Sequence, residues 1–414
     1  MATATAPAFR ANLAALFDAL ARTAPAAPAR PPLPILGSVV VDVGNDGTVQ
    51  LSAFDYEVSV ETSVDGALAK EPGRAVVSRA DLLRIVKAAC KGETKSVWSG
   101  WDVEFTTTAT TETRGTAESW TTVATHEADV EVGGFAMPVT AFAPADYPSL
   151  PVMDGVAGFI VDRDQLADAL SRVQLAAGSD DTLPALTGIK VELNEDEHSI
   201  TLAATDRFRL AVGTVAAEPR PGADEHGVAA LLPRGSFVAL LERMPAGPIT
   251  VDVDAAGSTV RLDGAGTVAT ARVLDAEFPR FRALLPNEIP HAFTADAKQL
   301  GKVIGKAVAL GDRMGSVRIT GDGETVRVAP YDSELPEGRV RGAAVPVSGS
   351  EEGLDFCANG RYLADALKAF TGEVAMGAQH LARTTKPIML AGSLADLGDV
   401  TAYRHMVMPV RMPS

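Results

Sequence analysis

The sequence has little of what metalloproteins, disulfide-stabilised proteins and membrane proteins depend on. It contains 2 cysteines and 6 scattered histidines in 414 residues, without the spacing of a metal site or a disulfide framework. No apolar run approaches the ~18 residues of a membrane-spanning helix. Arg10 and Asp18 interrupt the alanine-rich start, which argues against a secretory signal. We therefore expect a cytoplasmic chain with no cofactor, no metal and no membrane partner, in which Cys90 and Cys357 are small buried hydrophobes.

Basic residues are also few. The chain has 37 Lys and Arg against 53 Asp and Glu, which gives a formal net charge of −16. Such an excess of acid argues against binding to nucleic acid, unless the charges are unevenly distributed. A hydrophobic content of 46% is typical of a globular protein, and the length is enough for two to four domains.

What is present is a pattern that recurs three times. Alternation of apolar and polar residues between helical segments predicts antiparallel strands, so the fold class expected is α+β. We predict three repeated domains, 1–153, 154–288 and 289–414, each with two helices on one face of antiparallel sheets. The threonine-rich stretch 106–127 is interpreted as a long hairpin or a mobile loop. The predicted helices, two for each domain, are 9–22, 79–91, 162–173, 234–244, 295–306 and 360–370.

An aspartate also recurs in the repeat, at Asp55, Asp206 and Asp332. A catalytic acid is not expected on three equivalent elements, whereas a turn residue is. An aspartate between two alternating strands accepts hydrogen bonds from the backbone that follows it. We therefore interpret all three as turn residues.

The predicted helices are more basic than the rest of the chain. They carry 15 Lys and Arg against 8 Asp and Glu. Either these are ordinary solvated faces, or they form a basic surface that attracts a polyanion without reading its sequence. Six helices closed in a circle leave a bore of roughly 10 Å, and twelve leave closer to 30 Å, which is enough for duplex DNA. On the second hypothesis one chain is half of a ring and must dimerise.

Several phrases then match a family in order along the chain: RPPLPILGSVVV (30–41), AATDRFRLAV (203–212), LLPRGSFVALL (231–241), LDAEFPRFRALLP (274–286), NGRYLADAL (359–367) and VMPVRM (407–412). Over essentially its whole length the chain resembles the bacterial DNA polymerase III β subunit, the sliding clamp. An arginine-rich, lysine-poor composition resembles that of an actinobacterial member.

The resemblance implies a non-catalytic homodimeric ring around double-stranded DNA, bound without sequence preference. It implies partners that dock through linear peptide motifs, namely the DNA polymerase III α subunit, the clamp loader, and repair and translesion polymerases. The peptide cleft lies between the second and third domains, and its residues here would be Leu186, Thr205, Arg207, Phe208, Arg209, Leu210, Pro279, Leu284, Asn359, Tyr362, Met408, Pro409, Val410, Arg411 and Met412. The expected DNA contacts are Arg30, Arg79, Arg84, Lys87, Lys91, Lys298 and Lys302.

The chain departs from the family pattern near this cleft. Arg207 and Phe208 stand where many members have Gly-His, Met412 replaces a C-terminal leucine, and Pro184 and Ala185 replace aromatic residues. Three alternatives to a housekeeping clamp stay open. They are a specialised paralogue whose altered cleft resists a clamp-directed inhibitor, a three-repeat scaffold that does not bind DNA, and an enzyme that uses the aspartates as acid and base.

Overall fold

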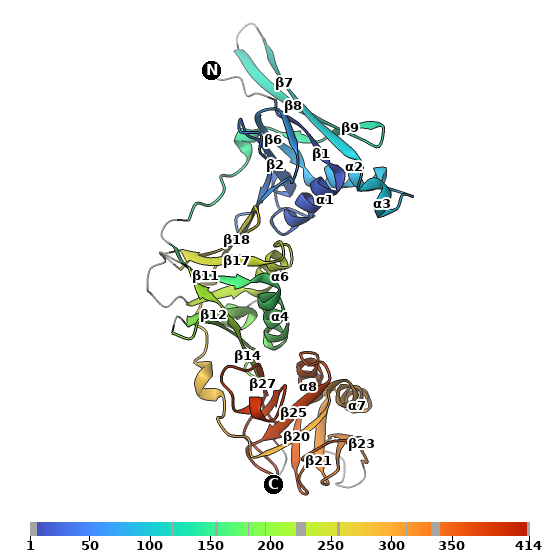
Figure 1. Cartoon of the computed structure of the whole chain (residues 1–414), viewed down its shortest axis with the longest axis vertical. Coiled ribbons are helices and arrows are strands. Elements are labelled where there is room, and N and C mark those ends of the chain that lie inside the picture. The colour runs from blue at the N-terminus through green and yellow to red at the C-terminus, as the bar shows by residue number, and fades with distance from the viewer. Residues whose placement is uncertain are drawn as a thin grey trace. The chain divides into compact units, whose positions relative to one another are not determined.

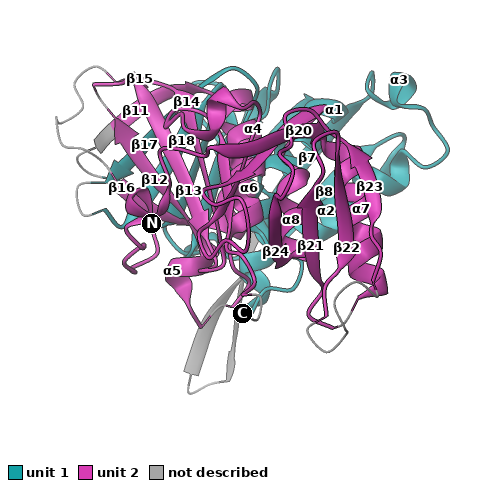
Figure 2. Ribbon diagram, turned by 90° about the horizontal axis from the view of Figure 1, so that it is seen from below, with its two compact units in different colours: residues 1–156, 239–272 teal, residues 157–238, 273–414 magenta. Residues whose placement is uncertain are grey.

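The structure is a computed structural model, which describes residues 6–116, 119–153, 156–180, 182–194, 196–220, 229–254, 257–311, 313–332 and 340–411. The chain divides into two compact units (Figures 1 and 2). Unit 1 is Met1–Val156 with Ala239–Arg272, and unit 2 is Ala157–Val238 with Val273–Ser414. Both are built of helices and antiparallel sheets, so the expected α+β class is confirmed. Among the described residues, no helix is both long and apolar enough to cross a membrane.

The first helix of each predicted domain begins at a side-chain cap. Helix α1 (Leu13–Arg22) follows Asn12, α4 (Arg163–Val173) follows Asp162, and α7 (Ala297–Leu310) follows Asp296. In each case the side-chain oxygen accepts a hydrogen bond from a backbone N–H of the first turn, at 2.9 Å for Asn12 and 2.7 Å for Asp296. These caps fix where the helices start.

A strand precedes each of these helices, and the prediction of a helix from residue 9 is therefore wrong. Strand β1 (Ala8–Asn12) holds Phe9 and Arg10, and its burial alternates along most of its length. The Arg10 guanidinium forms an ion pair with Asp102 and does not belong to a helix. The corresponding strands are β11 (Val156–Asp162) and β20 (His291–Asp296).

The second helices lie close to their predicted positions but end earlier. The side chain of Ser78 caps α2 (Arg79–Ala89), and that of Asn359 caps α8 (Gly360–Leu367). The division between the units falls inside α6 (Arg234–Leu241). The described residues also form two short helices, α3 (Lys95–Trp98) and α5 (Pro184–Thr187). Within their observed bounds, the six main helices still contain more Lys and Arg than Asp and Glu.

Unit 1 contains two runs of antiparallel strands, β5-β1-β7-β8-β9 and β10-β6-β2-β3-β4-β19-β18-β17. Its remaining strands are β2 (Ser38–Val43), β3 (Val49–Phe54), β4 (Val58–Ser63), β5 (Leu68–Glu71), β6 (Gly73–Ser78), β7 (Asp102–Thr116), β8 (Ser119–Val132), β9 (Phe135–Val139), β10 (Ala141–Phe142), β17 (Pro248–Asp254), β18 (Thr259–Gly264) and β19 (Thr267–Arg272). Strands β7 and β8 pair along their length, so the threonine-rich stretch is a hairpin rather than a loop.

Unit 2 contains the sheets β16-β12-β13-β14-β27-β26-β25-β20 and β23-β22-β21-β24, and the pair β11-β15. Its remaining strands are β12 (Gly188–Asn194), β13 (Ser199–Thr205), β14 (Arg209–Ala216), β15 (Glu218–Pro219), β16 (Ala229–Pro233), β21 (Ser316–Gly321), β22 (Thr325–Pro330), β23 (Ala343–Pro346), β24 (Asp355–Asn359), β25 (Glu373–Ala378), β26 (Ile388–Ala391) and β27 (Arg404–Val407). A buried apolar cluster lies beneath α7 and α8, around Phe293, Leu300 and Phe356.

Sheets continue across the predicted domain boundaries. Strand β4 of the first third pairs with β19 of the second, where the Ser59 and Thr270 hydroxyls lie 2.6 Å apart. Strand β14 of the second third pairs with β27 of the last. The boundaries of the two compact units therefore differ from those of the three predicted domains, and the division into three domains stays a prediction.

The interpretation of the repeated aspartates is confirmed at two of the three positions. Asp55 Oδ1 accepts hydrogen bonds from the backbone N–H groups two and three residues later, at 3.0 and 2.8 Å. Asp206 Oδ1 does the same at 3.0 and 2.9 Å. The segment that follows Asp332, 333–339, lies outside the described residues.

Tyr147 and Cys357 are two buried side chains whose pKa burial raises. The hydroxyl of Tyr147 accepts a hydrogen bond from Phe54 N at 2.8 Å, and burial raises the pKa of Tyr147 to about 12. Cys357 is buried as expected, and burial raises the pKa of its thiol to about 12, whereas Cys90 is only half-buried.

Candidate peptide cleft and basic helix face

A cleft of about 320 Å³ lies in unit 2, between the loop that follows α4, the turn between β13 and β14, and helix α8. The predicted residues that line it are Leu186, Arg207, Phe208, Arg209 and Tyr362. Its volume is at the lower end of the roughly 300–1,000 Å³ of small-ligand sites. The structure thus brings five predicted residues from three parts of the sequence to one hollow.

The turn between β13 and β14 sets the directions of two exposed side chains. Arg207 has a φ of +79°, in the left-handed region that residues other than glycine rarely adopt. The Thr205 hydroxyl donates to the carbonyl of Arg209 at 2.7 Å and accepts from Arg207 N at 3.2 Å. These bonds hold the turn, so that Arg207 and Phe208 stand out from the sheet.

Two aromatic rings form one side of the cleft. The rings of Phe208 and Tyr362 stack with centroids 6.2 Å apart, and Phe208 remains 53% exposed. The guanidinium carbon of Arg209 lies 4.7 Å from the centre of the Tyr362 ring. An exposed aromatic surface of this kind suits the apolar side chains of a ligand.

Arg209, which packs against the Tyr362 ring, belongs to a network of charged side chains. Arg209 donates to Asp206 Oδ2 at 2.9 Å and to Asp365 Oδ2 at 3.1 Å, and Lys368 donates to Asp365 Oδ1 at 2.7 Å. Burial acts to raise the pKa of Asp365, but hydrogen bonds from Lys368 and Arg209 outweigh it and lower the pKa. Burial raises the pKa of Tyr362, so this hydroxyl stays protonated at neutral pH.

The C-terminal segment is attached to the same region by backbone hydrogen bonds. Met408 N donates to the carbonyl of Phe208, and Val410 N donates to the carbonyl of Cys357, both at 2.8 Å. Pro409 forms an isolated antiparallel β-bridge with Ala358. Arg411 is exposed. Met412 lies outside the described residues.

The remaining predicted cleft residues do not line this hollow. Leu210 is buried in an apolar cluster with Phe278 and Phe281, and the Asn359 side chain caps α8. Pro279 and Leu284 are exposed at and before η5 (Phe281–Leu284). Sequence reasoning missed Asp180 and Arg234, which do line it. The Ser-Asp-Asp run at 179–181 was the available signal for Asp180.

Helix α7 presents the clearest basic face in unit 2. Lys298, Lys302 and Lys306 are exposed at four-residue intervals, opposite the buried Leu300 and Ile304. No ion pair joins any of the three lysines to another described residue. Such a stripe is available to a polyanion.

The predicted DNA-contact residues of unit 1 are of two kinds. Arg84, Lys87, Lys91 and Arg30 are exposed, and Arg84 is 3.7 Å from Asp81. Arg79 instead donates from Nε and Nη2 to the carbonyl of Leu20 near the end of α1, at 3.0 and 2.7 Å. This guanidinium caps a helix, which gives Arg79 a structural partner inside the protein.

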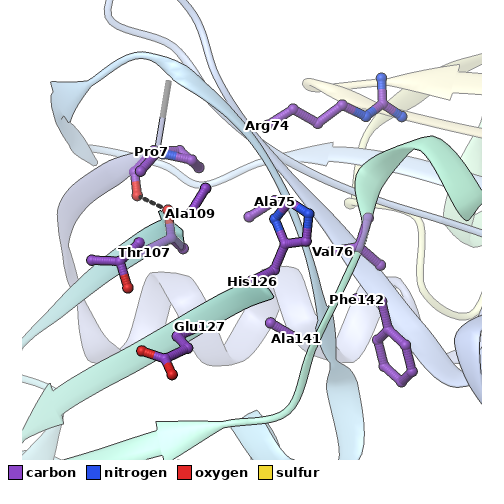
Figure 3. A pocket seen from close by; sticks show the side chains of 12 residues that line it. Pro7, Arg74, Ala75, Val76, Thr107, Ala109, His126, Glu127, Ala141 and Phe142 are labelled. Carbon is purple, nitrogen blue, oxygen red and sulfur yellow. Dashed lines mark hydrogen bonds between the residues drawn. The ribbon is translucent and has the colours of Figure 1, made fainter. Parts of the chain in front are cut away.

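A hollow in unit 1 is too small to be the site (Figure 3). Its volume is about 20 Å³, room for about one water molecule, and none of the predicted residues lines it. The Thr107 hydroxyl donates to the carbonyl of Pro7 at its edge, at 2.9 Å. Over the described part of the chain, no group of three His, Cys, Asp or Glu side chains is placed to hold a metal ion.

Comparison with known proteins shows which family and fold the chain resembles. Residues 8–106 match the family model described as DNA polymerase III beta subunit, N-terminal domain, and residues 160–280 match that of its central domain. The beta sliding clamp of Streptomyces coelicolor is 29% identical over 96% of this chain and 97% of its own. The beta sliding clamp homolog GriR of Streptomyces muensis is 28% identical over 92% and 93%. A crystal structure of a Pseudomonas aeruginosa sliding clamp bound to griselimycin has a TM-score of 0.78 at 18% identity, over 98% of this chain and 100% of that one, and shows the likeness in fold.

Proposed function

The chain belongs to the DNA polymerase III beta subunit family, and on this premise we propose that it is a non-catalytic sliding clamp. Two copies, each of three repeated domains, would close into a ring around double-stranded DNA in the cytoplasm. The ring would tether the polymerase α subunit, the clamp loader, and repair and translesion polymerases to the duplex.

The observation that carries the tethering role is the cleft of unit 2. A partner peptide would place apolar side chains on Phe208, Tyr362 and Leu186, while Arg207 would face its acidic groups. The Arg209 contacts to Asp365 and Tyr362 hold the cleft in shape before a ligand arrives. Leu210, Thr205 and Asn359 would support this site without touching the peptide.

The test is a titration of a labelled peptide taken from the C-terminal region of the cognate polymerase α subunit. Phe208→Ala should weaken binding about tenfold or more, because it removes one stacked ring. Phe135→Ala is the matched control, since Phe135 is 65% exposed on β9 of unit 1. A truncation that lacks residues 408–414 should also bind weakly. Equal binding by wild type, Phe208→Ala and the truncation would exclude the cleft.

A specialised clamp is the second candidate, and the Arg207-Phe208 turn favours it. These two side chains are bulkier than the Gly-His that many members carry, and they stand at the entrance of the cleft. They would change which ligands enter, including a clamp-directed inhibitor such as the griselimycin that the Pseudomonas aeruginosa clamp binds. Griselimycin binding to wild type and to the double variant Arg207→Gly, Phe208→His would separate the candidates. Tighter binding by the variant supports the specialised clamp, and equal binding supports the housekeeping one.

A further inference from the structure

A tyrosine links the C-terminal end of helix α4 to strand β27. Tyr403 directly precedes β27, and its hydroxyl donates a hydrogen bond to the backbone carbonyl of Arg172, in the last turn of α4, at 3.1 Å. The same hydroxyl lies 3.0 Å from Nδ1 of His405. Arg172 and Tyr403 belong to different thirds of the chain, and neither of them lines the peptide cleft.

The two contacts of the Tyr403 hydroxyl determine which ring nitrogen of His405 carries a proton. A carbonyl only accepts hydrogen bonds, so the hydroxyl proton points to the carbonyl of Arg172. The hydroxyl oxygen is left to accept from His405, whose Nδ1 is therefore the protonated nitrogen. His405 is fully buried, and burial lowers its pKa to about 3, so the ring is neutral at neutral pH and has one N–H. The other tautomer would leave one of the two contacts without a proton.

Packing holds the Tyr403 ring in this position. The guanidinium carbon of Arg172 lies 5.3 Å from the ring centre, and the Phe370 ring packs edge-on with centroids 5.5 Å apart. Strand β14 makes room at Gly213, where a Cβ would lie only 3.4 Å from Tyr403 and 3.3 Å from Val173. A residue without a side chain thus lets the tyrosine and the end of α4 both lie against β14.

The chain directly after the linked carbonyl forms one wall of the peptide cleft. Helix α4 continues through η4 (Gln174–Ala176) into a loop, residues 177–180 and 182–186, much of which lines the cleft. We call these residues the α4 loop. Gly178 N donates to the carbonyl of Leu186 at 2.7 Å, which closes the loop on itself. The position of this wall therefore depends on where the end of α4 is held.

The other partner of Tyr403 belongs to the strand that is paired with the opposite wall. In the ladder between β14 and β27, His405 lies opposite Ala211 and Val407 lies opposite Arg209. Arg209 holds the aromatic side of the cleft, as described above. A change in how Tyr403 sits between α4 and β27 would thus change the separation of the two walls.

We propose that Tyr403 is a positioning residue of the peptide cleft, an inference that rests on the function proposed above. Its hydroxyl fixes the α4 loop relative to the turn between β13 and β14 before a peptide arrives, and it does so without touching the peptide. Preorganisation of this kind lowers the entropic cost of binding. A residue that only stabilised the fold would change the melting temperature and leave the dissociation constant of the peptide unchanged.

The experiment measures two quantities on the full-length protein: the dissociation constant of the labelled polymerase α peptide, and amide hydrogen exchange of the α4 loop without peptide. Tyr403→Phe removes the hydroxyl and keeps the ring. It should weaken peptide binding about three- to tenfold and speed exchange of the loop severalfold, because one hydrogen bond that anchors α4 is lost. Tyr56→Phe removes the hydroxyl of a tyrosine of unit 1 that is 54% exposed, and this control should change neither quantity.

A matched pair of variants at His405 tests the hydrogen bond itself. His405→Asn keeps an N–H donor where Nδ1 lies, whereas His405→Leu has a similar size and no donor. The asparagine variant should bind the peptide within about twofold of wild type, and the leucine variant should weaken binding as much as Tyr403→Phe does. In the double variant Tyr403→Phe, His405→Leu the loss of affinity should not exceed that of either single variant by more than about twofold.

Three results would overturn the proposal. The first is equal peptide affinity of wild type and Tyr403→Phe, which would leave Tyr403 a structural residue even if the variant melts earlier. The second is weaker binding without faster exchange of the α4 loop, because the effect would then not pass through that loop. The third is equal loss of affinity in His405→Asn and His405→Leu. Absence of peptide binding by wild type is a different failure, since it would overturn the tethering function and this inference with it.

Discussion

The guanidinium of Arg209 lies 3.1 Å from the carboxylate of Asp365 and ties strand β14 to helix α8. The two residues are far apart in sequence and belong to different thirds of the chain. Arg209 also donates to Asp206 and lies over the ring of Tyr362. One side chain therefore fixes the turn, the aromatic wall and the helix that together form the cleft.

Loss of the ion pair between Arg209 and Asp365 should destabilise unit 2. We expect Arg209→Met to lower the free energy of unfolding by about 1–3 kcal/mol, because it leaves Asp206 and Asp365 without their partner. A double-mutant cycle with Asp365→Asn, measured by urea unfolding, should give a coupling energy of about 0.5–1 kcal/mol. Lys368→Met is the control, since its ammonium contacts the same carboxylate from a more exposed position. If the stability losses of the two single variants add up to that of the double variant, a direct interaction between Arg209 and Asp365 is contradicted.

Replacement of Arg207 by glycine should stabilise the turn. Glycine adopts a φ of +79° without the steric cost that arginine has there, and we expect a gain of about 0.5–1 kcal/mol in the free energy of unfolding. Phe208→Gly, one residue later, should instead destabilise the protein because it removes the stacked ring. A loss of stability in Arg207→Gly would mean that the side chain contributes more than the backbone strain costs.

Charge reversal on α7 should weaken association with DNA. The double variant Lys298→Glu, Lys302→Glu should be lost from nicked circular DNA severalfold faster than wild type, because phosphate contacts supply binding without sequence preference. Gel filtration of protein loaded on circular DNA measures this, and cutting the DNA should release the wild type. Lys95→Glu with Lys386→Glu makes the same charge change away from the six main helices. Equal losses by both double variants would contradict a DNA-facing role for α7.

Acid should destabilise the protein through His405. Burial lowers the pKa of His405 to about 3, with Arg209 acting in the same direction, while the unfolded chain keeps a pKa of 6.5. Between these values the unfolded state binds a proton that the folded state does not, so stability falls as pH drops below ~6.5. The slope from this group is at most about 1.4 kcal/mol per pH unit.

The variant His405→Phe should show a flatter dependence of unfolding free energy on pH over the same window. His380 is exposed, and His380→Phe should leave the dependence of the wild type unchanged. Parallel curves for wild type and His405→Phe would mean that other groups carry the acid sensitivity.

Much of the fold can be predicted from local patterns in the sequence. Helix positions follow from apolar spacing, and the aspartate turns follow from the ability of Asp55 and Asp206 to accept backbone hydrogen bonds. Strand β1 was missed because Phe9 continues the helical stripe of Leu13 and Leu16, although Phe9 and Ala11 also fit an alternating strand. Asn12, the cap of α1, was the available signal for the true boundary.

The site is harder to predict from the sequence, because its residues come together only through contacts between distant segments. The ion pair of Arg209 with Asp365, the helix cap that Arg79 provides and the buried position of Arg404 all depend on contacts between distant segments. Residue type cannot distinguish these arginines from those that face solvent. The family pattern supplied five residues of the cleft, and the sheet register decides which others reach it.

The ladder between Arg209–Val212 of β14 and Arg404–Val407 of β27 has a mechanical consequence. Tension on a peptide that is anchored beside Phe208 would load several antiparallel backbone hydrogen bonds in shear, all at once, instead of opening them one after another. Force along the strands would therefore have to break these bonds together before the second and third thirds of the chain came apart.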